Sequence, residues 1–173
     1  RGWHAVSTRM LAARAGVAPG VVHYHYQSLQ ALLREAAVGT MRRALGAAHP
    51  AFEYAGSMDV GMDLLLGPLD AYSGRDPTSL LFIEAYLAAT RDARLREEIT
   101  ALLQEFRREL ARWLGERGSD APEATAAVLA AAIDGVMLHR ALDPGLTSAA
   151  VTPVLRKLLT SDNDAGHCYS RKG

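Results

Sequence analysis

Apolar residues recur every three to four positions along most of the chain, a spacing that is typical of helices. The clearest case is residues 93–116, where the repeating apolar positions are Leu95, Ile99, Leu102, Phe106, Leu110, Trp113 and Leu114. Sustained alternation of apolar and polar residues, the pattern of a half-buried strand, is almost absent. The sequence therefore predicts an all-α fold.

Short stretches rich in Gly, Pro, Ser and Asp separate the apolar segments and mark the ends of the expected helices. We expect eight helices, at about 8–15, 19–26, 29–47, 57–73, 78–90, 93–116, 122–141 and 149–160. Pro50 is expected to close the third helix, and Gly67-Pro68 to kink or break the fourth. The polar segment 161–173 is predicted to be a mobile tail.

The chain has 173 residues, of which 49% are hydrophobic, so a sizeable core can form. No apolar run approaches the ~18 residues that a membrane-spanning helix needs, and no secretion signal opens the chain. The single cysteine, Cys168, excludes an intrachain disulfide framework and a cysteine-based zinc cluster. These features predict a cytoplasmic protein with no membrane partner.

The net charge of the whole chain is zero, but the charge is divided unevenly. Residues 1–49 hold six arginines and one acid, Glu35, which gives a net charge of +5. Residues 50–173 hold thirteen basic and eighteen acidic groups, which gives −5. The asymmetry indicates a basic partner-binding end on an acidic body, although ordinary scatter of surface charge would also produce it.

Residues 7–33 predict a helix-turn-helix followed by a third, capped helix. Ser7 and Ser28 are placed to cap the first and third of these helices. Gly16 permits a sharp turn between the first two, and Pro19 suits the first turn of the second. In such a unit the first helix braces the second, which fits the width of the DNA major groove.

Spacing within this unit separates a buried face from an outward one. The buried face is expected to contain Leu11, Ala12, Ala15, Val17, Val22 and Tyr26. His23 and His25 diverge on a helix and have no third ligand nearby, so they suit contact with a DNA groove better than a metal site. Tyr24 could contact a phosphate or pack internally, and the first of these is favoured.

The same segment resembles the TetR/AcrR family of bacterial regulators. The residues that match in type and spacing are Trp3, Ser7, Thr8, Leu11, Ala12, Ala15, Gly16, Val17, Gly20, Tyr26, Ser28, Ala31 and Leu32. A second, weaker similarity covers 131–147, which looks like the end of the penultimate helix of many members. The first match covers about a quarter of the chain.

The resemblance implies a nine-helix protein with two domains. Residues 1–47 would form the DNA-binding domain and its connecting helix, and 48–160 would form a regulatory and dimerisation domain, followed by the tail at 161–173. Because the chain opens at Arg1 just before the first helix-turn-helix segment, the family's first helix is expected to be missing here.

The resemblance also implies which residues contact DNA. Ser7 and Thr8 would approach phosphates from the start of their helix. Arg9 stands where some members place a base-reading arginine. The recognition helix would contribute Ala18, Pro19, Gly20, Val21, His23, Tyr24 and His25.

Two positions depart from the family pattern. Val21 stands where a hydroxyl side chain commonly donates to a phosphate, and Leu29 stands where a lysine commonly does. The loss of two phosphate contacts should lower the affinity for DNA and flatten its salt dependence. Arg34, Arg42 and Arg43, or residues preceding Arg1, could compensate.

In the second domain the resemblance implies a pocket for a small-molecule effector. The side chains that could line it are Met62, Phe82, Tyr86, Phe106, Trp113 and Met137. Large apolar residues at helical spacing more often form plain core, so that alternative stays open. Ala127, Ala131 and Gly135 form a ridge of small residues at spacing four, which could serve dimerisation or packing within the chain.

No catalytic arrangement is present in the sequence: there is no Ser/His/Asp or Cys/His set, no paired-carboxylate motif, no phosphate-binding loop and no HExxH. We therefore expect a protein that is not an enzyme and needs no cofactor or metal. The resemblance implies a ligand-responsive repressor that binds double-stranded operator DNA as a homodimer. The alternative is an all-helical small-molecule-binding protein or enzyme in which the helix-turn-helix is incidental.

Overall fold

The computed structural model describes residues 6–160 of the chain. The helices in this range are α1 (Thr8–Ala15), α2 (Pro19–His25), α3 (Leu29–Gly46), α4 (His49–Tyr54), α5 (Met58–Leu66), the 3-10 helix η2 (Gly67–Ala71), α6 (Pro77–Ala89), α7 (Ala93–Gly115), α8 (Pro122–His139) and α9 (Ser148–Thr160). No strand occurs in the described range, so the predicted all-α fold is confirmed. The predicted tail at 161–173, which includes Cys168, lies outside the described residues.

Local signals set the ends of the first helices. The Ser7 hydroxyl oxygen accepts a hydrogen bond from the Met10 N–H at 3.3 Å, and the Ser28 hydroxyl oxygen accepts one from the Ala31 N–H at 3.1 Å. Gly16 ends α1 with φ at +69°, a left-handed conformation that favours glycine. These three predicted helix ends are confirmed.

Pro50 was expected to close α3, but the helix already ends at Gly46, and Pro50 lies in the first turn of α4. Proline is tolerated there because the first turn of a helix has no use for its missing N–H. The sequence did not predict α4 because six residues are too few to show a helical period. The break expected at Gly67-Pro68 is confirmed, since α5 ends at Leu66 and a 3-10 turn follows.

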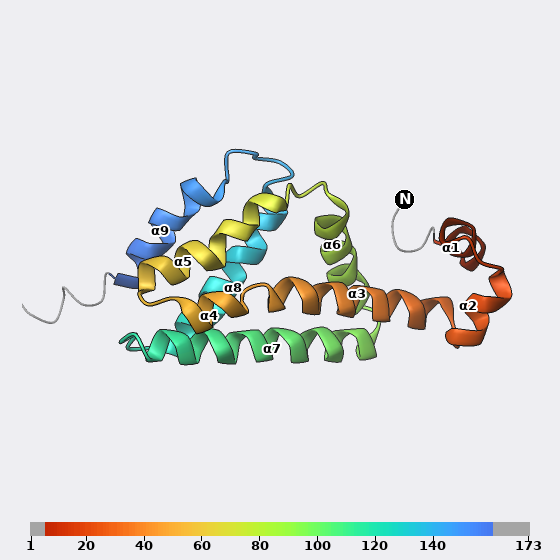
Figure 1. The fold of residues 1–173 in the computed structure, drawn as a ribbon, viewed down its shortest axis with the longest axis horizontal. Helices are drawn as coiled ribbons and strands as arrows, with labels where there is room; N and C mark the ends of the chain where they lie inside the picture. Colours follow the sequence, from red (N-terminus) through yellow and green to blue (C-terminus); the bar gives the residue numbers. More distant parts are fainter. Residues whose placement is uncertain (1–5, 161–173) are drawn as a thin grey trace, which may run out of the picture.

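α3 and α7 lie side by side along the length of the molecule (Figure 1). α8 packs along α7, and α9 packs on α5 and η2. α1 and α2 lie beyond the N-terminal end of α3, away from the other helices (Figure 1). Among residues 6–160, no helix is both long and apolar enough to cross a membrane.

Two groups of buried side chains hold these helices together. The larger group joins α4, α5, η2, α7 and α8, and includes Met62, Leu110 and Trp113. The smaller group, which we call the α3–α6–α7 cluster, consists of Ala37, Val38, Met41, Ala85, Ala89, Leu95, Ile99 and Leu102. Burial of such side chains stabilises a fold by roughly 1.5–3 kcal/mol for each large residue. The smaller cluster therefore holds α6 against α3, the helix that follows α2 in the chain.

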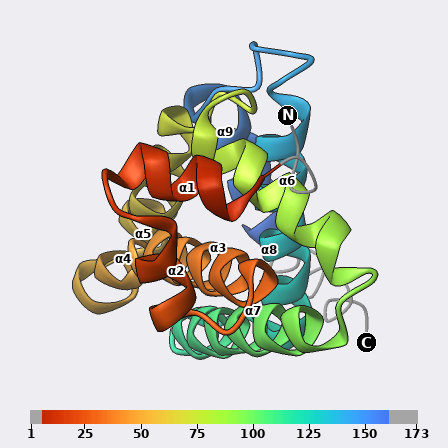
Figure 2. The ribbon, with the colours of Figure 1, turned by 90° about the vertical axis from the view of Figure 1, so that its right-hand side faces the viewer.

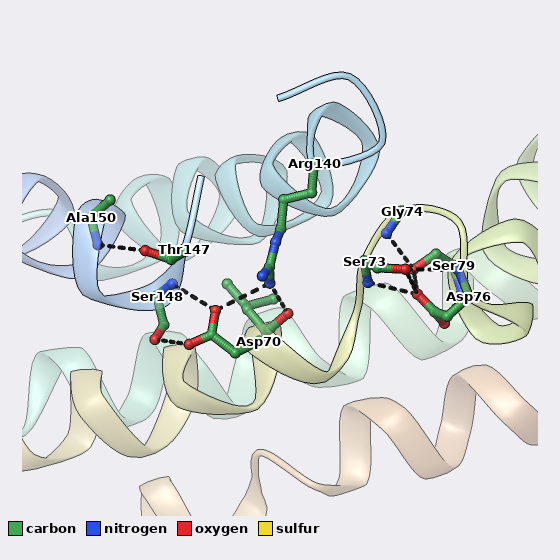
Figure 3. Close-up of polar contacts among 10 residues, drawn as sticks. Asp70, Ser73, Gly74, Asp76, Ser79, Arg140, Thr147, Ser148 and Ala150 are labelled. Carbon is green, nitrogen blue, oxygen red and sulfur yellow. Dashed lines mark hydrogen bonds and ion pairs between the residues drawn. The ribbon is translucent and has the colours of Figure 1, made fainter. Parts of the chain in front are cut away.

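Polar contacts join η2 to the end of α8 and the start of α9 (Figure 3). A guanidinium nitrogen of Arg140 lies 3.2 Å from the Asp70 carboxylate, which also accepts hydrogen bonds from the N–H and hydroxyl of Ser148. The hydrogen bonds from Ser148 are the main cause that lowers the pKa of Asp70, and the charge of Arg140 acts in the same direction. This contact fixes the end of α8 relative to η2 and α9.

A second set of polar contacts fixes the start of α6 (Figure 3). Asp76 accepts hydrogen bonds from the N–H groups of Thr78 and Ser79 at 3.0 Å, and from the Ser79 hydroxyl at 2.5 Å. Partial burial opposes ionisation of Asp76, but hydrogen bonds from Ser79 and Ser73 prevail and lower its pKa to about 2. Asp76 therefore caps α6 as a carboxylate.

Candidate nucleic-acid interface and ligand cavity

α1 and α2 form a unit that stands apart at one end of the molecule (Figure 1), the end that faces the viewer in Figure 2. Among the described elements, α1 packs closely only with α2. Ala12 of α1 is 1% exposed, and its carbonyl oxygen accepts the Val17 N–H at 3.0 Å to close the turn. The predicted helix-turn-helix is therefore present, and α2 projects from the body of the molecule.

Only part of the expected buried face of this unit is buried. Leu11, Val22 and Tyr26 are half-buried, in keeping with the prediction. Ala15 and Val17 are exposed, so their predicted burial is wrong. Both flank the turn at Gly16, and nothing within residues 6–160 covers that side of the unit.

The seven predicted contact residues of the recognition helix are all exposed: Ala18, Pro19, Gly20, Val21, His23, Tyr24 and His25. Tyr24 is 85% exposed, and its ring meets the His25 ring edge to face at 5.1 Å between centroids. A Cβ at Gly20 would meet nothing within 4 Å. The absence of a side chain at Gly20 therefore leaves room for a partner to approach the backbone of α2 closely.

The start of α1 supplies the other predicted contacts. Arg9 is exposed, whereas Ser7 and Thr8 are half-buried. The Ser7 oxygen accepts the capping hydrogen bond, so its proton remains available to an acceptor such as a phosphate oxygen. The first N–H groups of a helix also favour anions. The start of α1 thus has the groups that a phosphate contact requires.

The three arginines that could compensate for Val21 and Leu29 lie along α3. Arg34 forms an ion pair with Asp92 at 3.5 Å, and Arg43 donates to the Thr40 hydroxyl at 2.9 Å. Arg42 lies thirteen positions after the start of α3, or about 20 Å along its axis. Two of the three are thus engaged within the chain, and Arg42 is distant from α2.

A cavity of about 360 Å³ opens between α6 and α8. It is lined by Ser79, Phe82, Ile83, Tyr86, Leu87, Asp134, Gly135, Met137 and Leu138. Three of the six residues predicted to line an effector pocket, Phe82, Tyr86 and Met137, come together here. Its size and apolar walls are those of a small-molecule site.

The other three predicted pocket residues belong to the larger buried group. Met62 is fully buried, and Trp113 is 2% exposed beneath α5. Phe106 packs against Phe52 with the ring centroids 6.0 Å apart, and it also lines a separate cavity beside Leu45. Spacing along a helix marks core and cavity residues alike, so the sequence could not separate these two sets.

A half-buried polar pair at the α6–α8 cavity was not predicted from the sequence. The Tyr86 hydroxyl donates a hydrogen bond to the Asp134 carboxylate at 3.0 Å. Burial raises the pKa of Asp134, although Tyr86 and Arg107 oppose the shift. Burial, followed by the nearby carboxylate, also raises the pKa of Tyr86. The available signal was a lone acid within the apolar stretch 126–138 of α8.

α8 also presents an exposed apolar face. Val128 is 66% exposed and Leu138 is 50% exposed, and Leu142 just beyond the helix is 87% exposed. Val128, Ala131, Gly135 and Leu138 recur at steps of three and four, which places them on one side of α8. Of the predicted small-residue ridge, Ala131 is exposed, whereas Ala127 and Gly135 are half-buried.

Comparison with known proteins gives matches in both halves of the chain. Residues 1–36 match the bacterial regulatory proteins of the tetR family, and residues 56–161 match the tetracyclin repressor-like C-terminal domain. The fold is similar to the crystal structure of a candidate transcriptional regulator from Streptomyces coelicolor A3(2), with a TM-score of 0.68 and 28% identity over 91% of this chain and 88% of that one. No curated protein matches the chain. The C-terminal match alone spans more than half of the sequence, so the chain belongs to the TetR family of DNA-binding transcriptional regulators.

Proposed function

We propose that this protein is a ligand-responsive repressor that binds a palindromic operator as a homodimer. One observation carries the link between ligand and DNA. Phe82 and Tyr86 line the α6–α8 cavity and also pack against the α3–α6–α7 cluster. Only three residues separate the start of α3 from the end of α2. A change at the cavity therefore has a short, packed route to the recognition helix.

In this proposal α2 enters the major groove of the operator. Its exposed His23, Tyr24 and His25 would meet base edges and phosphates, while Ser7 and Thr8 hold a phosphate at the start of α1. Arg9 would read a guanine, the commonest specific contact of an arginine with DNA.

The exposed apolar face of α8 supports a homodimer. Contiguous apolar side chains on a surface are typical of protein interfaces, and Val128, Ala131 and Leu138 provide such a surface here. In a two-fold dimer the two copies of α2 would face half-sites one or more helical turns apart, about 34 Å for one turn. Operator symmetry would then mirror the symmetry of the protein.

An effector would act by shifting a population between two arrangements of the dimer. Binding between α6 and α8 would favour the arrangement in which α6 is displaced, and α3 would follow because the two helices share a buried cluster. The spacing of the recognition helices would then no longer fit both half-sites. Effector and operator would weaken each other's binding by the same factor.

Replacement of Tyr24 by Ala tests the DNA-binding surface. Tyr24 is 85% exposed, so its removal should leave folding intact while it weakens binding to the DNA upstream of the gene by about tenfold. The matched control is Tyr54→Ala, because Tyr54 is also exposed, at 75%, but lies on α4. Fluorescence anisotropy with labelled DNA measures both variants.

Equal affinities for Tyr24→Ala, Tyr54→Ala and the unaltered protein would contradict the assignment of α2 to the groove. Failure of the unaltered protein to bind any DNA would favour the alternative, an all-helical small-molecule-binding protein or enzyme with an incidental helix-turn-helix.

A further inference from the structure

Asp134 is the only charged residue among the nine that line the α6–α8 cavity. Ser79, another polar lining residue, is already paired, since it donates to Asp76 and accepts the Gly74 N–H at 3.3 Å. The remaining lining is almost entirely apolar. A ligand in this cavity would therefore meet a single strong polar feature, the Asp134 carboxylate with the Tyr86 hydroxyl.

The Asp134 carboxylate is only partly engaged by hydrogen bonds within the described part of the chain. Tyr86 of α6 donates to Oδ2, and no hydrogen bond to Oδ1 is formed among residues 6–160. The charge of Arg107 on α7 acts on the carboxylate and opposes the rise in its pKa, but among residues 6–160 the two side chains form no ion pair. A half-buried carboxylate in this position is stabilised further by a cation that contacts it directly.

We propose that the α6–α8 cavity binds an apolar molecule that carries one protonated amine, with the ammonium group on Asp134 and the hydrocarbon part against Phe82, Met137 and Leu138. The inference rests on the proposed function only in taking this cavity as the effector site. It adds the chemical class of the effector.

Three properties of the cavity favour a cation over other ligands. The free oxygen of Asp134 can accept a charge-assisted hydrogen bond from an ammonium group. The rings of Phe82 and Tyr86 lie in the same wall and attract cations through their π faces. An anion would meet a carboxylate with no cationic residue in the lining to offset it.

The cavity also limits the size of the ligand and marks its entrance. A volume of about 360 Å³ accommodates one aromatic ring with a short alkyl chain. Leu87 of α6 lines the cavity and is 60% exposed, so it forms an apolar rim open to solvent outside the proposed dimer face of α8. A ligand can enter past this rim with its hydrocarbon part in contact with apolar atoms.

Three molecules of similar shape test the proposal: 4-phenylbutylamine, 4-phenylbutanol and 4-phenylbutyrate, which are cationic, neutral and anionic at pH 7. Isothermal titration calorimetry with the full chain, without DNA, measures the binding of each. We expect the amine to bind at least about tenfold more tightly than the alcohol, as one charge-assisted contact provides, and the carboxylate to bind most weakly. Equal binding of amine and alcohol, or tightest binding of the carboxylate, would overturn the proposal.

Substitution of Asp134 tests whether this residue causes the preference for the amine over the alcohol. Asp134→Asn should reduce the affinity for 4-phenylbutylamine about tenfold while the affinity for 4-phenylbutanol changes little. The matched control is Asp120→Asn, which removes the same charge from an exposed site just before α8 and should leave all three affinities unchanged. An Asp134→Asn protein that keeps the full preference for the amine would place the cation elsewhere. If that variant does not fold, the ranking of the three molecules on the unaltered protein still decides.

The outcome separates this inference from the proposed function. Tight amine binding without release of DNA would support the cationic cavity and contradict ligand-responsive repression. Release of DNA by the alcohol or the carboxylate in preference to the amine would support ligand-responsive repression and contradict the preference of the cavity for a cation.

Discussion

At the scale of single residues, Gly61 is a position with almost no room for a side chain. A Cβ there would lie 2.0 Å from Cζ2 and 2.6 Å from Cη2 of Trp113. Trp113 is 2% exposed and packs against Phe52 with the ring centroids 6.2 Å apart, so its ring cannot easily move away. α5 and α7 can therefore approach each other here only because position 61 has no side chain.

Gly61→Ala should destabilise the protein by about 1–3 kcal/mol, the usual cost of extra volume in a packed core. Urea unfolding followed by circular dichroism measures the change. Gly46→Ala is the matched control, since a Cβ at Gly46 would meet nothing within 4 Å. If the two variants unfold at the same urea concentration, the contact between α5 and Trp113 is not as close as described.

At the scale of helices, the sequence was informative wherever local chemistry sets a boundary. Ser7, Gly16 and Ser28 fix the ends of α1 and α3 through caps and a left-handed turn, so those helices could be located to within a residue or two. α4 was not predicted because six residues are too few to show a helical period. In addition, Pro50 suits the first turn of a helix as well as the position after its end.

The exposure of a candidate site residue could be predicted only where it depends on the spacing within a single helix. Exposure of Tyr24 follows from the spacing within α2, but exposure of Val17 depends on what surrounds the turn. The pairing of Tyr86 with Asp134 joins positions 48 apart, and only the packing of α6 on α8 brings them together. The same packing determines that Phe82 reaches a cavity while Trp113 reaches the core.

The exposed face of α8 gives a prediction at this scale. Ala131→Arg would place a long charged side chain in the proposed interface, and should convert a dimer into a monomer in size-exclusion chromatography with light scattering. Ala101→Arg adds the same side chain at an exposed position of α7 and should leave the dimer intact. A dimeric Ala131→Arg protein would show that the subunits meet elsewhere.

At the scale of the whole molecule, the N-terminal part of the chain, which includes α1 and α2, is basic and the rest is acidic. Residues 1–49 have a net charge of +5 and residues 50–173 have −5. A basic end attracts DNA, while the acidic body disfavours other orientations on the same phosphate backbone. The cavity lies between α6 and α8, and the α3–α6–α7 cluster is the packed connection between the two ends.

Recognition of DNA by α2 is tested by a titration of the DNA upstream of the gene with the full chain across a series of salt concentrations. A shuffled DNA of equal length is titrated in parallel. We expect log affinity to fall linearly with log salt, and the upstream DNA to bind about a thousandfold or more tightly than the shuffled DNA. The slope should be shallow because Val21 and Leu29 offer no polar group to a phosphate. Equal binding of the two DNAs, or no salt-sensitive binding to either, would contradict a sequence-reading role for α2.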